Sequence, residues 1–238
     1  MKTFRTALIA TSLLLPIVTL ASQGDSTLLW SSFTATPSTG VAITWTDRIS
    51  YVFADSPVAS SAAFAGAPDW TSLRTVSESS GDATGAAEAD ADRLFSRSEG
   101  TTSSALGQAW REGIFTMSGP GTVTFEVDYT VSVLGTAGNN FNFTTAAASL
   151  LLDSNAPRVD AILDSINGDA AQSGRLQLLV TNSSAGPVSW KLIGGATTVT
   201  TVTTAVPEPA TGALVMGALG LMGWARRRQS SRDNPRVA

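Results

Sequence analysis

The stretch that decides the fold is Thr122–Val133, which reads TVTFEVDYTVSV. Every second residue of it is β-branched or aromatic and apolar: Val123, Phe125, Val127, Tyr129, Val131 and Val133. All the residues between them are polar. Because the side chains of a strand alternate between the two faces of its sheet, this pattern predicts a strand with one face on a core and the other in water. A sheet with one wet face is typical of antiparallel architecture.

Further strand signals follow on both sides at short intervals. The Gly119-Pro120-Gly121 turn predicts a hairpin with residues 114–117 as the partner strand. Alternation or short apolar runs predict other strands over 28–33, 41–46, 49–53, 146–152, 176–180 and 188–192. Alternating alanines and acids favour a strand over a helix in residues 86–95. Many short strands separated by Gly, Pro, Ser and Asn predict a mainly β protein, an antiparallel β-sandwich of jelly-roll type.

The first residues have the pattern of a secretory signal. Lys2 and Arg5 form a short positive region, and the uncharged stretch 6–19 is rich in Leu, Ile and Ala. Small residues then lead up to Ala21, so we predict that signal peptidase cleaves after Ala21. The apolar part is too short for a comfortable membrane span. We therefore expect residues 1–21 to be a signal peptide helix that is removed on export.

A second membrane signal lies at the other end. It consists of Val206, Pro207, Glu208 and Pro209, an uncharged run over 210–225, and then Arg226, Arg227 and Arg228. The run has 16 residues and as a helix would cover about 24 Å, against a hydrocarbon core of about 30 Å. A span this marginal suits a transient anchor. The arginines stay on the cytoplasmic side, so the chain before them has crossed the membrane.

This order of a Pro-Glu-Pro motif, a short hydrophobic helix and an arginine cluster resembles the PEP-CTERM sorting signal of Gram-negative bacterial proteins, which are exosortase substrates. The resemblance covers residues 206–228. It implies that an exosortase recognises Pro207, Glu208 and Pro209 at the inner membrane and that the helix is removed together with a basic cytoplasmic tail, residues 229–238. It also implies delivery to the cell surface or extracellular matrix. The alternative is a single-pass anchor that is never cut.

Between the two signals we expect one secreted sandwich domain over residues 22–196. The Thr-rich segment 197–205 is a linker or a last strand. Residues 22–205 carry 17 acidic and 8 basic side chains, a formal charge of −9. An acidic surface of this kind repels nucleic acid, so a nucleic-acid partner is not expected.

The chain contains no cysteine and no histidine. Histidine is the usual general base near neutral pH and the commonest transition-metal ligand. Its absence, together with that of cysteine, excludes ordinary Ser-His-Asp triads, cysteine nucleophiles and zinc sites. We therefore expect no cofactor and no enzymatic activity. A glycoside hydrolase that uses a pair of carboxylates stays open as an alternative.

Two groups of residues are candidate binding sites. Asp82, Glu88, Asp90 and Asp92 form the densest acidic cluster and are candidate calcium ligands, although a solvated acidic strand face fits them better. Trp70 follows Pro68 and Asp69 in a loop-like stretch, so it is the tryptophan expected to be exposed and able to stack on a sugar. The leading interpretation is a surface or matrix structural protein associated with biofilm or exopolysaccharide. The second is a carbohydrate-binding module retained at the surface.

Overall fold

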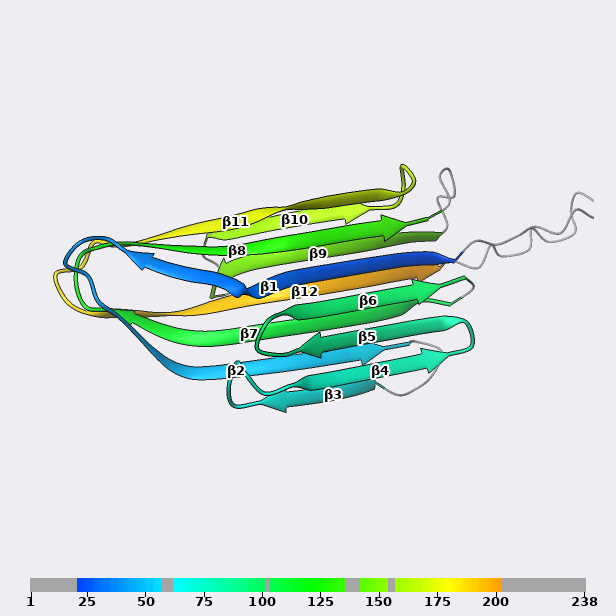
Figure 1. Cartoon of the computed structure of the whole chain (residues 1–238), viewed down its shortest axis with the longest axis horizontal. Helices are drawn as coiled ribbons and strands as arrows, with labels where there is room; N and C mark the ends of the chain where they lie inside the picture. The colour runs from blue at the N-terminus through cyan, green and yellow to red at the C-terminus, as the bar shows by residue number, and fades with distance from the viewer. Residues whose placement is uncertain (1–20, 57–61, 102, 136–141, 154–156, 203–238) are drawn as a thin grey trace, which may run out of the picture.

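The computed structural model describes residues 21–56, 62–101, 103–135, 142–153 and 157–202, and they form twelve strands in two antiparallel sheets (Figure 1). Sheet A has the order β11-β8-β1-β6-β5-β4, with β1 (Ser22–Pro37), β4 (Arg74–Ser80), β5 (Ala83–Ala89), β6 (Leu94–Gly100), β8 (Gly121–Leu134) and β11 (Ala170–Asn182). Sheet B has the order β10-β9-β12-β7-β2-β3, with β2 (Ile43–Asp55), β3 (Ala62–Ala67), β7 (Ala105–Met117), β9 (Asn142–Leu152), β10 (Arg158–Asp164) and β12 (Val188–Val202).

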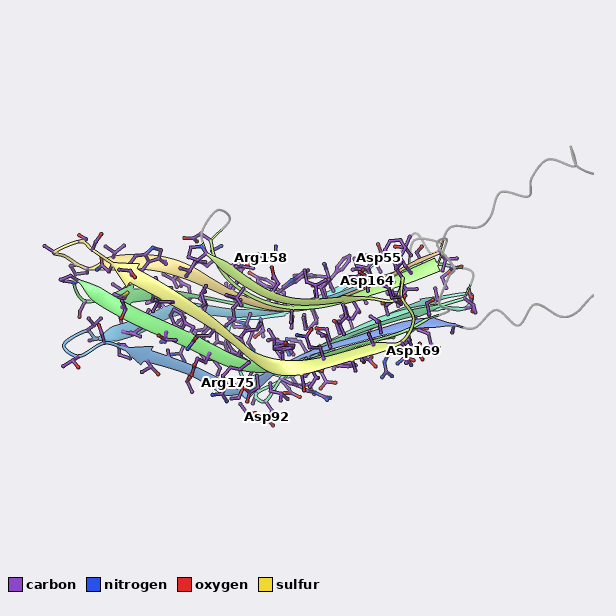
Figure 2. All side chains as sticks on the ribbon, turned by 90° about the horizontal axis from the view of Figure 1, so that it is seen from above. Asp55, Asp92, Arg158, Asp164, Asp169 and Arg175 are labelled. Atoms are coloured by element: carbon purple, nitrogen blue, oxygen red, sulfur yellow. The ribbon has the colours of Figure 1, made fainter. Side chains whose placement is uncertain are left out.

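The predicted antiparallel β-sandwich is confirmed, and side chains fill the space between its two layers (Figure 2). It is larger than the usual jelly roll of eight strands, so the jelly-roll assignment stays a prediction. Both expected helices, in the signal peptide and after Pro209, lie outside the described residues. The part of the chain that the structure describes has no helix long and apolar enough to cross a membrane.

The stretch that predicted the fold lies in β8, between β11 and β1 in sheet A. Phe125 and Val127 are fully buried, as the alternation requires. The acids Glu126 and Asp128, at the alternate positions, face outward, and Asp128 receives a 2.6 Å hydrogen bond from Arg175 of β11. Residues 43–46 and 49–53, parts of two predicted strands (41–46 and 49–53), instead belong to the single strand β2, with an irregular register between Thr46 and Ile49, and residues 41–42 precede it.

The two halves of the core differ in composition. One half is aromatic, with Phe115 and Phe125 fully buried at 4.8 Å between ring centroids. The other half is lined by small residues, among which the Thr200 hydroxyl hydrogen-bonds those of Ser98 and Thr144 at 2.9 and 3.0 Å. Small residues let the sheets approach closely. A methyl group added at Gly107 on β7 would lie 2.3 Å from the carbonyl oxygen of Ala86 on β5.

Both ends of the described domain lie at the small-residue end of the sandwich (Figure 1). Ser22 pairs with Gly100 at the end of β6, and a methyl group at Gly100 would lie 3.6 Å from Thr200 of β12. Residues 197–202 of the Thr-rich segment belong to β12, so this part of it is strand and not linker. At the far end, the turns after β1 and β7 are joined by a hydrogen bond from the Ser118 amide to the Ala42 carbonyl.

Candidate functional site

Trp70 lies in the connection between β3 and β4 and is half-buried against the core, so the expectation that it is exposed was wrong. Its indole N–H donates a 2.8 Å hydrogen bond to the backbone carbonyl of Glu112. Its ring packs edge-on against Trp30 and Trp45, with centroids 5.2 and 5.0 Å away. Gly113 makes this possible, because a methyl group there would lie 2.4 Å from the Trp70 ring. The indole is thus a packing element whose polar atom is already used.

The aromatic cluster around Trp70 brings together rings from β1, β2 and the connection between β3 and β4. Trp30 and Phe33 of β1 stack at 4.5 Å, and Trp45 of β2 packs against Phe33 at 6.1 Å. The guanidinium of the exposed Arg48 lies 5.1 Å from the centre of the Trp70 ring. A cation over an indole face is favourable, but it also occupies surface that a sugar ring would need.

Asp69 fixes the turn that carries Trp70. Its carboxylate accepts hydrogen bonds from the hydroxyls and the backbone amides of Thr71 and Ser72, at 2.6 to 3.1 Å. The hydroxyl of Ser72, followed by the two amides, holds the pKa of Asp69 well below its ordinary value, because each of these donors favours the charged form. In turn, the Ser50 hydroxyl donates to the Asp69 carbonyl at 2.7 Å. The loop is therefore held in place by polar contacts on both sides.

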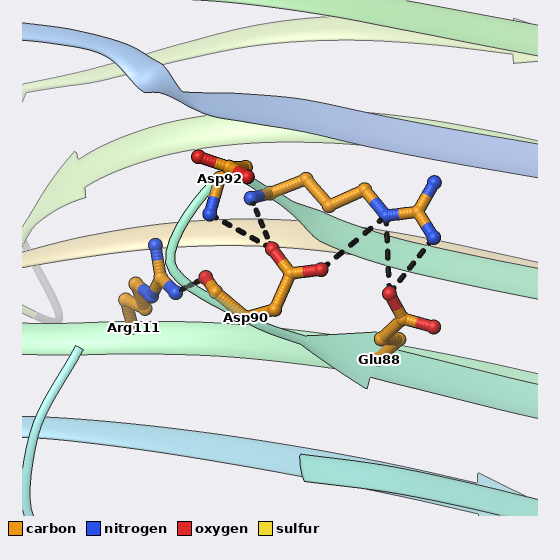
Figure 3. A network of polar contacts seen from close by, with 5 residues as sticks. Glu88, Asp90, Asp92 and Arg111 are labelled. Atoms are coloured by element: carbon orange, nitrogen blue, oxygen red, sulfur yellow. Dashed lines mark hydrogen bonds and ion pairs between the residues drawn. The ribbon is translucent and has the colours of Figure 1, made fainter. Parts of the chain in front are cut away.

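Three of the four acidic candidates, Glu88, Asp90 and Asp92, lie together, and the carboxylates of Glu88 and Asp90 are bonded within the protein (Figure 3). Glu88 accepts two hydrogen bonds from Arg93, at 2.8 and 3.1 Å. Asp90 caps the turn between β5 and β6 by accepting the backbone amides of Asp92 and Arg93, both at 2.8 Å. Partial burial raises the pKa of Asp90, but these hydrogen bonds outweigh it and the pKa lies below its ordinary value.

The fourth acidic candidate, Asp82, does not join the other three. It precedes the first residue of β5, whereas Asp90 follows the last. The seven residues of β5 separate them, so the eight steps from Asp82 to Asp90 cover roughly 26 Å at about 3.3 Å per residue. Asp82 instead accepts the backbone amide of Thr101 at 2.9 Å. Within the described ranges, no group of three or more His, Cys, Asp or Glu residues is placed to hold a metal ion.

The sequence interpretation missed Arg111, which is fully buried on β7 between the two sheets. Its guanidinium donates a hydrogen bond to the backbone carbonyl of Asp90 (Figure 3) and lies 5.0 Å from the centre of the Trp30 ring. Nε and Nη1 have no partner among the described residues. Burial lowers the pKa of Arg111 to about 10, although the negative charges of Asp90, Asp69 and Asp92 raise it. The alternation of β7, which places position 111 inward between Ala109 and Gly113, is the signal that could have revealed it.

The residues of the two predicted processing signals lie at or beyond the ends of this domain. Ala21 is exposed and directly precedes β1, whose first residue, Ser22, is 1% exposed. At the other end, the last described residue is Val202. Two predicted groups lie outside the described residues: the sorting motif, Val206, Pro207, Glu208 and Pro209, and the arginine cluster, Arg226, Arg227 and Arg228.

Comparison with protein families identifies this C-terminal region, since the PEP-CTERM protein-sorting motif family matches residues 205–229. The chain carries a PEP-CTERM sorting motif. No curated protein and no solved structure matches the chain. The matched residues contain the whole of the segment 206–228 that the sequence pattern indicated.

The PEP-CTERM motif marks the chain as an exported protein that is targeted to an exosortase, with processing at the membrane and a location at the surface or outside the cell. The motif begins three residues after the end of β12. Because β1 starts at that same end of the sandwich, both terminal signals connect to one end of the domain. The folded domain and the sorting motif are thus separate in sequence and nearly adjacent along the chain.

Proposed function

We propose that this protein is a structural component of the bacterial cell surface or extracellular matrix, associated with biofilm or exopolysaccharide, and that it is not an enzyme. The single observation that carries the proposal is the PEP-CTERM motif at residues 205–229, joined directly to a β-sandwich. The domain is built from strand pairings and packed side chains. The candidate residues found in it serve turns, ion pairs and core packing, which suits a protein whose task is mechanical or adhesive.

The route begins with signal peptidase, which cleaves after Ala21 and leaves Ser22 as the new first residue. This position is supported by the start of β1 at Ser22, because cleavage further along would remove residues that pair with both β6 and β8. The run 210–225 then holds the chain in the inner membrane, with Arg226, Arg227 and Arg228 on the cytoplasmic side. An exosortase binds Pro207, Glu208 and Pro209 and releases the domain from the helix and from the tail 229–238.

Two other functions are distinguished from this one by experiment. A carbohydrate-binding module would bind exopolysaccharide saturably, and replacing Trp70 would abolish binding. A glycoside hydrolase would release sugar, and turnover would disappear on mutation of either of two carboxylates. We propose neither, because the Trp70 indole N–H is bonded within the fold and Glu88 and Asp90 are bonded to Arg93 and to turn amides.

The test is the intact mass of the protein recovered from the surface fraction of its native host. The expected form begins at Ser22 and ends near Pro207 to Pro209. Replacing Pro207, Glu208 and Pro209 together by alanine should abolish this form and leave the protein in the inner membrane. A matched control replaces Pro187, in the turn before β12, by alanine, and should be processed normally. Recovery of a surface form that retains Arg226 to Ala238 would refute exosortase processing.

A further inference from the structure

The outward face of sheet B carries an apolar surface that the core does not use. In an antiparallel sheet, directly paired residues point to the same face, so the register defines lateral rows across the strands. One row runs through Tyr51, Trp110, Gly195 and Ser149, on β2, β7, β12 and β9. The next row contains Phe64, Phe53 and Gln108. Their neighbours along the strands, Val52 and Ala109, are fully buried, so the rows themselves face outward.

The row of Phe64 and Phe53 continues through Gln108, Thr197 and Ala147 to Ile162, so exposed apolar side chains lie at both edges of sheet B with polar and small residues between them. At one edge Phe64 of β3 is 63% exposed, and at the other edge Ile162 of β10 is 53% exposed. Between them, Trp110 lies down over β12, because a methyl group at Gly195 would come within 2.8 Å of its Cδ1 atom. The glycine thus lets the indole lie along the sheet and keeps the face flat. Exposed apolar patches of more than a few hundred Å² mark interaction sites on soluble proteins.

The outward face of sheet A is different and serves as an internal comparison. Its central rows carry ion pairs, Asp25 with Arg97 and Asp128 with Arg175, each with a closest distance of 2.6 Å. On sheet B the charges lie around the aromatic rows, with Arg158, Asp164 and Asp55 on its outer side (Figure 2). Two ion pairs lie on this side of sheet B, Lys191 with Glu112 on β12 and β7 at 3.4 Å and Arg158 with Asp160 on β10 at 2.5 Å. From β2 to β9 the rows of Phe53 and Tyr51 carry no charge, and charged residues lie around them, as at the polar rim of a protein interface.

The size of the face also fits a protein partner. Six strands spaced by about 4.8 Å give a width of about 24 Å, and the nine residues from Leu106 to Ile114, which include the charged Glu112, give a length of about 27 Å. The projected area is about 650 Å², close to the ~800 Å² that each partner buries in a stable complex. Two such faces can pack at the usual sheet-to-sheet spacing of about 10 Å.

From these observations we propose that the outer face of sheet B is a self-association surface through which two copies of this chain pack face to face. The domain carries a formal charge of −9 over residues 22–205, so two copies repel each other unless they meet at an uncharged surface. A face that pairs with itself about a two-fold axis closes into a dimer. A polysaccharide would find hydrogen-bonding groups in these rows at Tyr51, Gln108 and Ser149, whereas Ile193, Leu151 and Ile162 offer none to its hydroxyls. The inference concerns the folded domain and does not depend on exosortase processing.

A charge at the centre of the face tests this proposal. Gln108→Arg adds a charge in the row of Phe53 and removes no apolar contact, so the fold should be retained. Thr130→Arg, on the exposed face of sheet A, is the matched control. In sedimentation of the protein recovered from the host, Gln108→Arg should weaken dimerisation at least tenfold, while Thr130→Arg should change it less than twofold. Equal behaviour of the two variants, or a monomeric parent protein, overturns the proposal.

A crosslinking experiment gives an independent readout in the cell. The chain has no cysteine, so Gln108→Cys and Thr130→Cys each introduce a single thiol without further changes. A short bismaleimide applied to intact cells should yield a covalent dimer for Gln108→Cys and none for Thr130→Cys. If Gln108→Arg abolishes retention on exopolysaccharide and no dimer forms, the face binds a glycan and the self-association proposal is wrong. The C-terminal mass of the same samples reports processing separately, so failure of either proposal is recognised on its own.

Discussion

The close approach of the two sheets at Gly107 makes a quantitative prediction for Gly107→Ala. The added methyl carbon would lie 2.3 Å from the carbonyl oxygen of Ala86 and 2.5 Å from that of Arg97. Ordinary contact begins at 3.4 Å, so strand β5 must retreat by about 1.1 Å (3.4 − 2.3). Both obstructing atoms are backbone atoms of paired strands, and neither can rotate away as the end of a side chain could.

The free-energy cost of this displacement follows from the packing contacts that it weakens between the two sheets. A gap of 0.5–1 Å forfeits about a quarter to a half of each dispersion contact across it. Overpacking a core usually costs about 1–3 kcal/mol, and we expect about 3 kcal/mol here because the obstruction is rigid on both sides. For a domain of this size, that corresponds to a fall in Tm of roughly 6–12 °C.

The control is Gly186→Ala, because nothing lies within 4 Å of a methyl group at Gly186 and its φ is not in the left-handed region. It should leave stability unchanged or raise it by up to about 1 kcal/mol, through reduced freedom of the unfolded chain. Urea unfolding followed by tryptophan fluorescence measures both variants, because Trp30, Trp45 and Trp70 pack together in the core region. If the free energies of unfolding of the two variants differ by less than about 1 kcal/mol, the two sheets do not approach as closely at Gly107 as this reasoning requires.

Three further predictions follow from the polar groups of the domain. Arg111→Met should lower the free energy of unfolding by no more than about 1 kcal/mol, or raise it, because it removes a buried charge with two unpartnered nitrogens. Arg111→Ala should lower it by about 3 kcal/mol, because the removed side chain leaves a cavity. A loss of more than about 1 kcal/mol for the Met variant in urea unfolding would contradict this. The pKa values of Asp69 and Asp90 lie below their ordinary values in the folded state, so the contribution of these carboxylates to the free energy of unfolding is complete above the unfolded-state pKa and is lost as the pH falls through the lower folded-state values. Stability should therefore fall below about pH 4. Asp69→Asn should make that fall shallower in acid titrations followed by circular dichroism. Thr200→Val should cost about 1–3 kcal/mol, because it leaves the buried Ser98 and Thr144 hydroxyls without their shared partner, and an unchanged urea midpoint would show that water replaces it.

The sequence allowed most of the fold to be predicted wherever one face of a strand is strongly apolar. Strand β8 has β-branched and aromatic residues at each inward position, so the alternation alone identified it. Strands β3, β4 and β10 were not predicted. In β4, Thr, Ser and Glu occupy most positions, because it is a sheet edge with a small inward face, and a pattern without apolar contrast carries no period-2 signal.

The predictions for individual side chains succeeded less often, and the reason is tertiary. Trp70 has loop-like neighbours in the sequence, but its position depends on Gly113, Trp30 and Trp45, which come from three other strands. Asp82 and Asp90 are close in sequence and far apart in the structure, because an extended strand separates them. The sorting motif could be predicted because it is a linear motif. The order of its residues along the chain defines it, and no contact in the folded structure is needed.

The arrangement of the domain bears on whether the proposed self-association is compatible with the proposed membrane anchor. The strands run along the long axis of the sandwich, and the chain enters and leaves the described domain at one end of that axis (Figure 1). The aromatic rows of sheet B cross its outer face at Tyr51 and Phe53 of β2, whereas the described chain begins and ends at strand ends. Burying Trp110 and its neighbours between two copies would therefore be compatible with the anchored form as well as with the released one. It follows that dimers should be detectable before exosortase processing, and their appearance only after cleavage would mean that the anchor, and not the sheet, controls assembly.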